Sequence, residues 1–360
     1  MIASRREKAT QTRKERPANG LRASIKGNKR SIPKRKMVSF VIKDHVIRYI
    51  DSKKPDLSGV IACGEHYLPS GVIRDGKIMD VERFRTILRD CVRKWKLKNR
   101  EVQFLVPDSR VIVRKIETPI DIQDDEIKGH LYLELGTNIH LPFDNPIFDI
   151  DVLGQKEDKK EVLLFAAPEE LVTEYTQIMK SVNLKPTVAD VSSLAIYRLF
   201  HKVYGESDHA ISDGSTTLSV QFDLQTVTIS VLSQHKLLLL RQFKMNLSME
   251  NWERKIDRHG ASEPIWIGDE SYLKYEINVM MGEIQRIINF YRTLTQHDDE
   301  IEIILLTGDY PDLKGIAQDL QQAFGKVPLL FRNELFDTQS TELITPKYYL
   351  ALGLSLKGDF

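Results

Sequence analysis

A pattern of short strands joined by tight turns occurs twice in this chain, and it limits the possible folds more than any other feature of the sequence. The first copy has apolar runs at residues 38–42, 46–50 and 57–63, with a turn at Lys43-Asp44-His45. The second copy has runs at 209–212, 217–223, 227–232 and 236–243, with Asp213-Gly214 as its first turn. Two such meanders in one chain predict a duplicated α/β architecture.

Helical periodicity follows each meander. Asp80 is a suitable N-cap for a helix over residues 81–95, in which apolar residues recur at steps of three and four. After the second meander, the apolar residues Ile277, Ile284 and Tyr291 belong to a long helix over about 271–295. We predict a buried strand at 301–306 and a helix that ends at Gly325.

The segment between the two halves has a different pattern of predicted strands and helices. We predict strands at 102–106 and 111–116, a helix over about 124–135, strands at 147–152 and 161–167, and a helix that begins at Pro168. We therefore expect a small α+β subdomain at 101–185 inserted into the first domain, which comprises 37–100 and 186–207. The second domain is expected at 208–360.

The first 36 residues differ from the rest in charge. They hold 13 Lys and Arg against two acidic residues, whereas the other 324 hold 39 basic and 49 acidic residues. Few of them are apolar, so we expect these residues to form a disordered tail. We also expect residues 37–360 to fold without this tail. The tail could bind the anionic inner leaflet of a membrane, bind nucleic acid, or be an upstream extension of a reading frame that begins at Met37. Since no aromatic residue is interleaved for base stacking, specific nucleic-acid binding is not expected.

Other features exclude several classes of protein. No run approaches the roughly 20 apolar residues of a membrane-spanning helix, and no secretory signal is present. Two cysteines suit a reducing compartment, so we expect a cytoplasmic location. The nine histidines lack the spacing of metal ligands, and the common phosphate-loop, zinc-protease and hydrolase motifs are missing. We therefore predict neither a catalytic residue nor a metal site.

Several short motifs, in their order along the chain, resemble one known family over roughly residues 37–358. They are Leu68-Pro69-Ser70-Gly71-Val72-Ile73, Asp75-Gly76-Lys77-Ile78-Met79-Asp80, Val106-Pro107 with Ser109, Leu141-Pro142-Phe143, Phe148-Asp149-Ile150-Asp151, Ala166-Ala167-Pro168, Asp190 with Ala195, Glu283-Ile284-Gln285-Arg286 with Tyr291, and Ala351-Leu352-Gly353-Leu354. This set is similar to the PilM-type assembly proteins of type IV pili and competence pseudopili, which are relatives of the division protein FtsA.

The resemblance implies an actin-like (ASKHA) fold in which the inserted subdomain contacts partners. It also implies a partner, a PilN-like bitopic membrane protein whose cytoplasmic tail would bind where the inserted block meets the first domain, and it allows self-association. Apolar residues of 102–116 and of Leu141-Pro142-Phe143 are the candidate lining, and they could equally be ordinary core. The protein would then lie at the inner face of the cell membrane.

In actin-like folds, two facing turns and a glycine pair bind a nucleotide's phosphates and adenosine, and this sequence departs from that pattern. The first turn has Asp44, a candidate for the acid on the metal side, but no glycine, and only glycine lets backbone N–H groups approach an anion closely. The second turn offers Asp213, Gly214, Ser215 and Thr216, which read equally as a plain hairpin. At the adenosine side, Gly308 is followed by Asp309, whose carboxylate would repel phosphate.

These departures favour a degenerate nucleotide site with no bound cofactor, and hence a scaffold in pilus or pseudopilus assembly. The rival hypothesis is an active actin-like ATPase that binds ATP with magnesium and hydrolyses it during assembly. A third hypothesis, a nucleic-acid binder, depends entirely on the basic tail.

Overall fold

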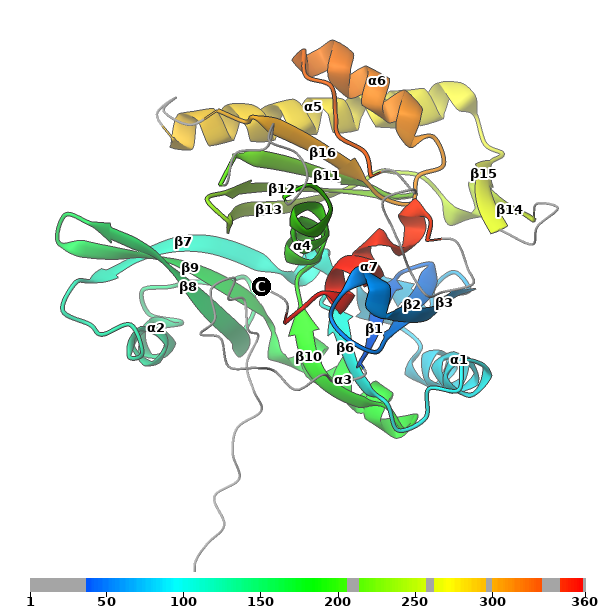
Figure 1. The fold of residues 1–360 in the computed structure, drawn as a ribbon, viewed down its shortest axis with the longest axis horizontal. Helices are drawn as coiled ribbons and strands as arrows, with labels where there is room; N and C mark the ends of the chain where they lie inside the picture. Colours follow the sequence, from blue (N-terminus) through cyan, green and yellow to red (C-terminus); the bar gives the residue numbers. More distant parts are fainter. Residues whose placement is uncertain (1–36, 206–213, 257–261, 296–299, 332–343, 359–360) are drawn as a thin grey trace, which may run out of the picture.

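The computed structural model describes residues 37–205, 214–256, 262–295, 300–331 and 344–358. The basic tail and Asp213 lie outside these residues. Two mixed sheets form the centre of the molecule, and a third, smaller sheet lies to one side of them (Figure 1).

The first sheet begins with the predicted meander. Its strands are β1 (Met37–Lys43), β2 (Val46–Ser52), β3 (Val60–Tyr67), β6 (Glu101–Leu105) and β10 (Lys185–Asp190), in the order β10-β6-β1-β2-β3. β1, β2 and β3 are antiparallel, and β6 and β10 run parallel to β1. Side chains alternate along β1, since Val38 and Phe40 enter one apolar core while Val41 enters another. The first sheet is therefore buried on both faces.

Helices cover both faces of the first sheet. One core contains α1 (Val81–Lys94) and α3 (Glu169–Ser181), and the other contains α4 (Ser192–Tyr204) and α7 (Tyr349–Ser355). The predicted N-cap is confirmed, because the Asp80 carboxylate accepts a hydrogen bond from the Arg83 N–H. The same core that holds α4 and α7 includes Leu232, Leu240 and Leu305 of the second sheet, so it joins the two halves.

The second sheet repeats the plan of the first. Its strands are β11 (Thr217–Phe222), β12 (Thr226–Ser233), β13 (Lys236–Lys244) and β16 (Ile303–Thr307), in the order β13-β12-β11-β16. β16 runs parallel to β11, and a parallel bridge from Leu305 to Leu329 adds a further position at its edge. The predicted duplication is thus present in the order and direction of the strands.

Two helices cover the outer face of the second sheet, α5 (Glu270–Leu294) and α6 (Leu313–Phe324) (Figure 1). Gly325 ends α6 with a φ of +69°, as the sequence predicts. The remaining short elements are the strand pairs β4 (Ile73–Arg74) with β5 (Lys77–Ile78) and β14 (Trp252–Ile256) with β15 (Ser262–Trp266), and the 3-10 turns η1 (Leu57–Gly59), η2 (Asp108–Arg110), η3 (Met249–Asn251) and η5 (Pro346–Tyr348).

The third sheet lies within the segment 101–185. It has the order β7-β9-β8, with β7 (Ile112–Pro119), β8 (Pro146–Lys156) and β9 (Lys159–Pro168), and α2 (Ile127–Glu134) packs against it. The strand that opens the segment, β6, instead pairs with β1, and its last helix, α3, packs with α1. The segment therefore contributes both a separate small sheet and part of the core of the first unit.

Candidate functional site

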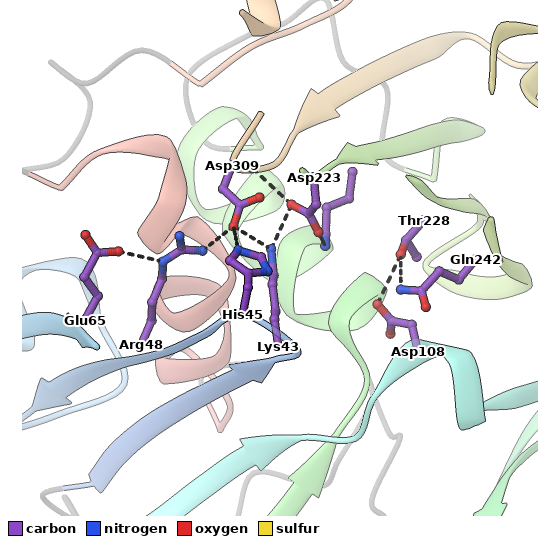
Figure 2. Close-up of polar contacts among 10 residues, drawn as sticks. Lys43, His45, Arg48, Glu65, Asp108, Asp223, Thr228, Gln242 and Asp309 are labelled. Carbon is purple, nitrogen blue, oxygen red and sulfur yellow. Dashed lines mark hydrogen bonds and ion pairs between the residues drawn. The ribbon is translucent and has the colours of Figure 1, made fainter. Parts of the chain in front are cut away.

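The two equivalent hairpins face each other at the junction of the two units. The first is the β1–β2 turn, which starts at Lys43, and the second is the β11–β12 turn, which starts at Asp223. Because β16 runs parallel to β11, the residues that follow it, Gly308 and Asp309, reach the same edge. The Lys43 Nζ lies 2.8 Å from Asp223 Oδ1 and 3.2 Å from Asp309 Oδ2 (Figure 2). One side chain of the first unit thus bridges two carboxylates of the second.

Asp309 is the centre of this cluster. Its Oδ2 also accepts a hydrogen bond from Arg48 at 2.5 Å and lies 3.5 Å from His45 Nε2 (Figure 2). The Arg48 Nε donates to Glu65 at 3.1 Å, and Lys347 binds the other oxygen of Glu65 at 2.6 Å. Cations of the first unit therefore surround a buried carboxylate of the second unit.

Burial and neighbouring charges oppose each other in setting the pKa values here. Burial raises the pKa of Asp309, but the charges of Lys43 and Arg48 outweigh it and hold that pKa well below its usual value. Burial and the negative charge of Asp309 raise the pKa of Asp223, against the effect of Lys43. Of these two carboxylates, Asp309 is therefore the one more strongly held in its charged form.

A glycine makes the approach of the two loops possible. Gly308 has a φ of +129°, and a Cβ added to it would lie 1.9 Å from the carbonyl oxygen of Phe222. The backbone therefore passes directly against the end of β11, where the Asp309 N–H donates to Asp223 Oδ1 at 3.0 Å. Gly308 is required for packing of this loop, whatever else the loop does.

A second polar bridge joins the units beside the first. Asp108, in η2 after β6, accepts hydrogen bonds from Ser192 at 2.6 Å and from Thr228 of β12 at 3.3 Å. Gln242 of β13 donates to the Thr228 hydroxyl at 3.0 Å (Figure 2). Burial, with a smaller effect from Asp223, raises the pKa of Asp108 to about 6. This carboxyl therefore ionises at a higher pH than an ordinary aspartate does.

The residues expected at a nucleotide site are not all in one place. The carboxylate of Asp44 turns away and accepts hydrogen bonds from the backbone N–H groups of Asp75 and Gly76. Gly214, Ser215 and Thr216 precede β11, whereas Gly308 follows β16 and lies at the junction, so β11 separates them. Ser215 and Thr216 instead donate hydrogen bonds to Glu302.

The junction residues that sequence reasoning omitted are Lys43, Arg48 and Asp223. The signal for Asp223 was the repeat itself, because Asp223 follows the first strand of the second sheet just as Asp44 follows β1. Asp213-Gly214 is a more typical turn sequence than the residues around Asp223. The second phosphate-binding turn was therefore predicted at the opposite end of β11.

The polar groups at the junction bind one another. Phosphate binding needs free N–H groups and cations, but the Asp309 N–H serves Asp223, and Lys43 and Arg48 already bind carboxylates. Asp223 and Asp309 would repel an added phosphate. In the described part of the chain, no group of three or more His, Cys, Asp or Glu residues is arranged to hold a metal ion.

Comparison with known proteins assigns the chain to a family. The sequence model of the type IV pilus assembly protein PilM matches residues 44–251, more than half of the chain. The chain belongs to the PilM family. No curated protein matches the chain.

Several solved structures are similar to this chain. A PilM-PilN type IV pilus biogenesis complex is similar with a TM-score of 0.66 and 17% identity, over 91% of this chain and 99% of that one. The ethanolamine utilization protein EutJ from Carboxydothermus hydrogenoformans has a TM-score of 0.46 and 12% identity, over 91% of each chain. MreB5 of Spiroplasma citri bound to ADP has a TM-score of 0.42 and 10% identity, over 90% of this chain and 96% of that one.

The predicted duplicated actin-like fold is confirmed for this PilM-family chain. Within the described residues, no helix has the length and apolar character needed to cross a membrane.

Proposed function

We propose that this PilM-family chain is a scaffold that does not hydrolyse ATP in type IV pilus or competence pseudopilus assembly. It would bind the cytoplasmic tail of a PilN-like bitopic membrane protein and so lie at the inner face of the cell membrane. The observation that carries the non-catalytic part is the contact of Lys43 with both Asp223 and Asp309, where the two hairpins meet.

This contact opposes catalysis for a physical reason. Phosphoryl transfer depends on cations and N–H donors already aimed at the phosphate oxygens, and loss of one such donor typically costs about 10²- to 10³-fold in rate. Lys43 and Arg48 would have to leave buried carboxylates before they could serve a phosphate. The buried charges left behind would raise the energy of that state.

The edge of the third sheet supports the partner-binding part. In the sheet order β7-β9-β8, β8 is an edge strand, and no strand of the described residues pairs with its outer side. An extended peptide can add to such an edge through main-chain hydrogen bonds. Beside it, α2 exposes Tyr132 and Leu133 at 67% and 77%, and Tyr132 stacks on Phe148 of β8. Within the described residues, the edge thus combines a strand that has no neighbouring strand on its outer side with exposed apolar side chains.

The start of β8 also adjoins the first unit, where the sequence places the partner site. Ile147 packs against the core that contains α1 and α3, and the Glu169 N–H at the start of α3 donates to the carbonyl of Asn145. Of the lining expected from sequence, Val102 is buried within the first sheet, whereas Leu141 and Phe143 pack against the core under α2. The proposed surface is therefore β8 with α2.

The test is titration of labelled N-terminal tail peptides from PilN-like proteins against the full chain. We expect Leu133→Glu to weaken binding at least tenfold, because it places a charge beside the apolar surface. Val327→Glu is the matched control, since Val327 is 73% exposed on the second unit. Deletion of 101–185 is unsuitable because it removes β6 from the first sheet. Absence of binding at ~100 μM, or equal loss in both variants, would contradict the partner hypothesis.

The rival ATPase is tested separately by magnesium-dependent turnover of ATP. The scaffold hypothesis predicts no release of phosphate above background, even when a tail peptide is present. Turnover that disappears in Lys43→Ala would contradict it.

A further inference from the structure

Helix α5 carries an exposed apolar stripe that the proposed scaffold role does not use. Its inner side packs onto the second sheet through residues such as Met280, Ile284 and Tyr291. On its outer side, five large apolar side chains are exposed, each by more than a third: Tyr272, Tyr275, Val279, Phe290 and Leu294. Steps of three, four and eleven residues are close to whole helical turns, so these side chains form one line along the helix.

The apolar stripe is separate from the polar part of the exposed surface. Lys274 and Arg292 are exposed and fall on the other side of the helix by the same periodicity, and the exposed Asn278 and Asn289 border the stripe. Between Val279 and Phe290, the stripe is completed by Gly282, Glu283 and Arg286. We call the eight residues from Tyr272 to Leu294 on this line the α5 stripe. They are Tyr272, Tyr275, Val279, Gly282, Glu283, Arg286, Phe290 and Leu294.

Two aromatic residues of the α5 stripe lie symmetrically about its centre. Tyr275 and Phe290 are equally distant from the point between Gly282 and Glu283. A second α5 running antiparallel, with a two-fold axis at this point, would place Tyr275 of one copy opposite Phe290 of the other. A Cβ at Gly282 would meet nothing within 4 Å, so the surface there is open and low. The two helices could approach closely at the axis.

The charges of the stripe are also complementary to themselves. Glu283 and Arg286 form an ion pair within the helix, next to the proposed axis. Helical side chains lean toward their own N-terminus, so in an antiparallel pair each Glu283 leans toward Arg286 of the other copy. Two symmetric ion pairs can therefore form across the axis. An anionic lipid surface would instead favour a net positive charge along the apolar line. The one cation there, Arg286, is paired with Glu283, and Lys274 and Arg292 lie on the other side.

We propose that the α5 stripe binds the same stripe of a second copy of this chain and forms a symmetric antiparallel dimer. This surface is on the outer layer of the second unit, away from β8 and the third sheet (Figure 1). The dimer therefore does not depend on the proposed partner or on the absence of ATP hydrolysis.

Cysteine crosslinking tests the position of the axis. In Gly282→Cys, each new thiol faces its counterpart, so mild oxidation of the full chain should give a covalent dimer. The native Cys63 and Cys91 are buried and leave a low background. Lys274→Cys is the control, since it is equally accessible but on the polar side, and it should remain uncrosslinked. Crosslinking of both variants to the same extent, or of neither, overturns the proposal.

Sedimentation of charge variants tests the pairing. Glu283→Arg and Arg286→Glu should each weaken the dimer at least tenfold, because each puts like charges near the axis, and the double exchange should restore it. Phe290→Glu should give monomers, and its exposed position leaves folding intact. A wild-type monomer at ~100 μM, or a dimer indifferent to all three single changes, overturns the proposal. Binding to phosphatidylglycerol vesicles that Phe290→Glu abolishes, without any dimer, overturns it in favour of a lipid surface.

Discussion

The β1–β2 hairpin and the β11–β12 hairpin occupy equivalent places in the two units but carry opposite charges at their junction. The first supplies Lys43 and Arg48, and the second, with the loop after β16, supplies Asp223 and Asp309. Turns that in an actin-like fold could hold an anion between them here bind each other directly. Duplication thus brings the two turns together, and the side chains decide whether they hold a ligand or join the two units.

The largest expected effect on stability comes from substituting Gly308, and another glycine of the second unit, Gly214, provides the comparison. Gly308→Ala would put a methyl group 1.9 Å from the Phe222 carbonyl oxygen, so the loop after β16 must move. We expect a loss of more than about 4 kcal/mol in the free energy of unfolding, measured by urea denaturation. Gly214→Ala, with its nearest contact at 3.5 Å and a φ of +87°, should cost only about 1–2 kcal/mol. Similar losses in the two variants would contradict the packing role of Gly308.

The ion cluster predicts the next largest effect. Asp309→Ala leaves the buried Arg48 and the half-buried Lys43 with one carboxylate fewer, and breaking a buried ion pair typically costs about 3–5 kcal/mol of stability. Asp56→Ala, which removes the half-buried partner of the exposed Lys54 and of Ser58, should cost about 1 kcal/mol or less. Urea denaturation of both variants at pH 7 makes the comparison. An Asp309→Ala protein as stable as Asp56→Ala would show that the cluster does not join the units.

Acid should remove this difference. Because the folded pKa of Asp309 lies below its unfolded value of about 3.9, its stabilising contribution is complete above that value. The contribution is lost as the pH falls toward the folded pKa. The gap between wild type and Asp309→Ala should therefore shrink below about pH 4, and a gap that widened with acid would contradict the assigned charge state.

The second bridge should respond to pH with the opposite sign. The pKa of Asp108 is raised to about 6, so ionising this carboxyl costs stability in the folded state. Asp108→Asn keeps groups that can hydrogen-bond Ser192 and Thr228 without the charge. Its stability relative to wild type should grow by about 3 kcal/mol between about pH 4 and pH 6 and then stay constant. If denaturation midpoints showed that the stability of Asp108→Asn relative to wild type is constant or falls over that range, burial could not be the cause of a raised pKa of Asp108.

Local patterns predict much of this fold but little of its junction. The meander, α1, α5 and the end of α6 depend on spacing, caps and turns that neighbouring residues decide, and their sequence signals were sufficient. The pairing of β6 with β1 joins strands far apart in sequence, which no local pattern reveals. The sequence indicated that the Asp309 carboxylate would repel phosphate. It did not reveal that Asp309 contacts Lys43 and Arg48, because these residues lie more than 260 positions away in the sequence. The charge was therefore visible in the sequence, and its partners were not.

The central claim is that side chains of the two units occupy the position of a nucleotide's phosphates, and the most direct test is equilibrium stabilisation by ATP. The full chain is melted with and without millimolar ATP and magnesium. A ligand at 100 times its dissociation constant adds about 2.7 kcal/mol to the free energy of unfolding, which thermal denaturation detects readily. We predict no change in the melting temperature of the wild type. A rise of several degrees with ATP, lost in Lys43→Ala, would contradict the claim.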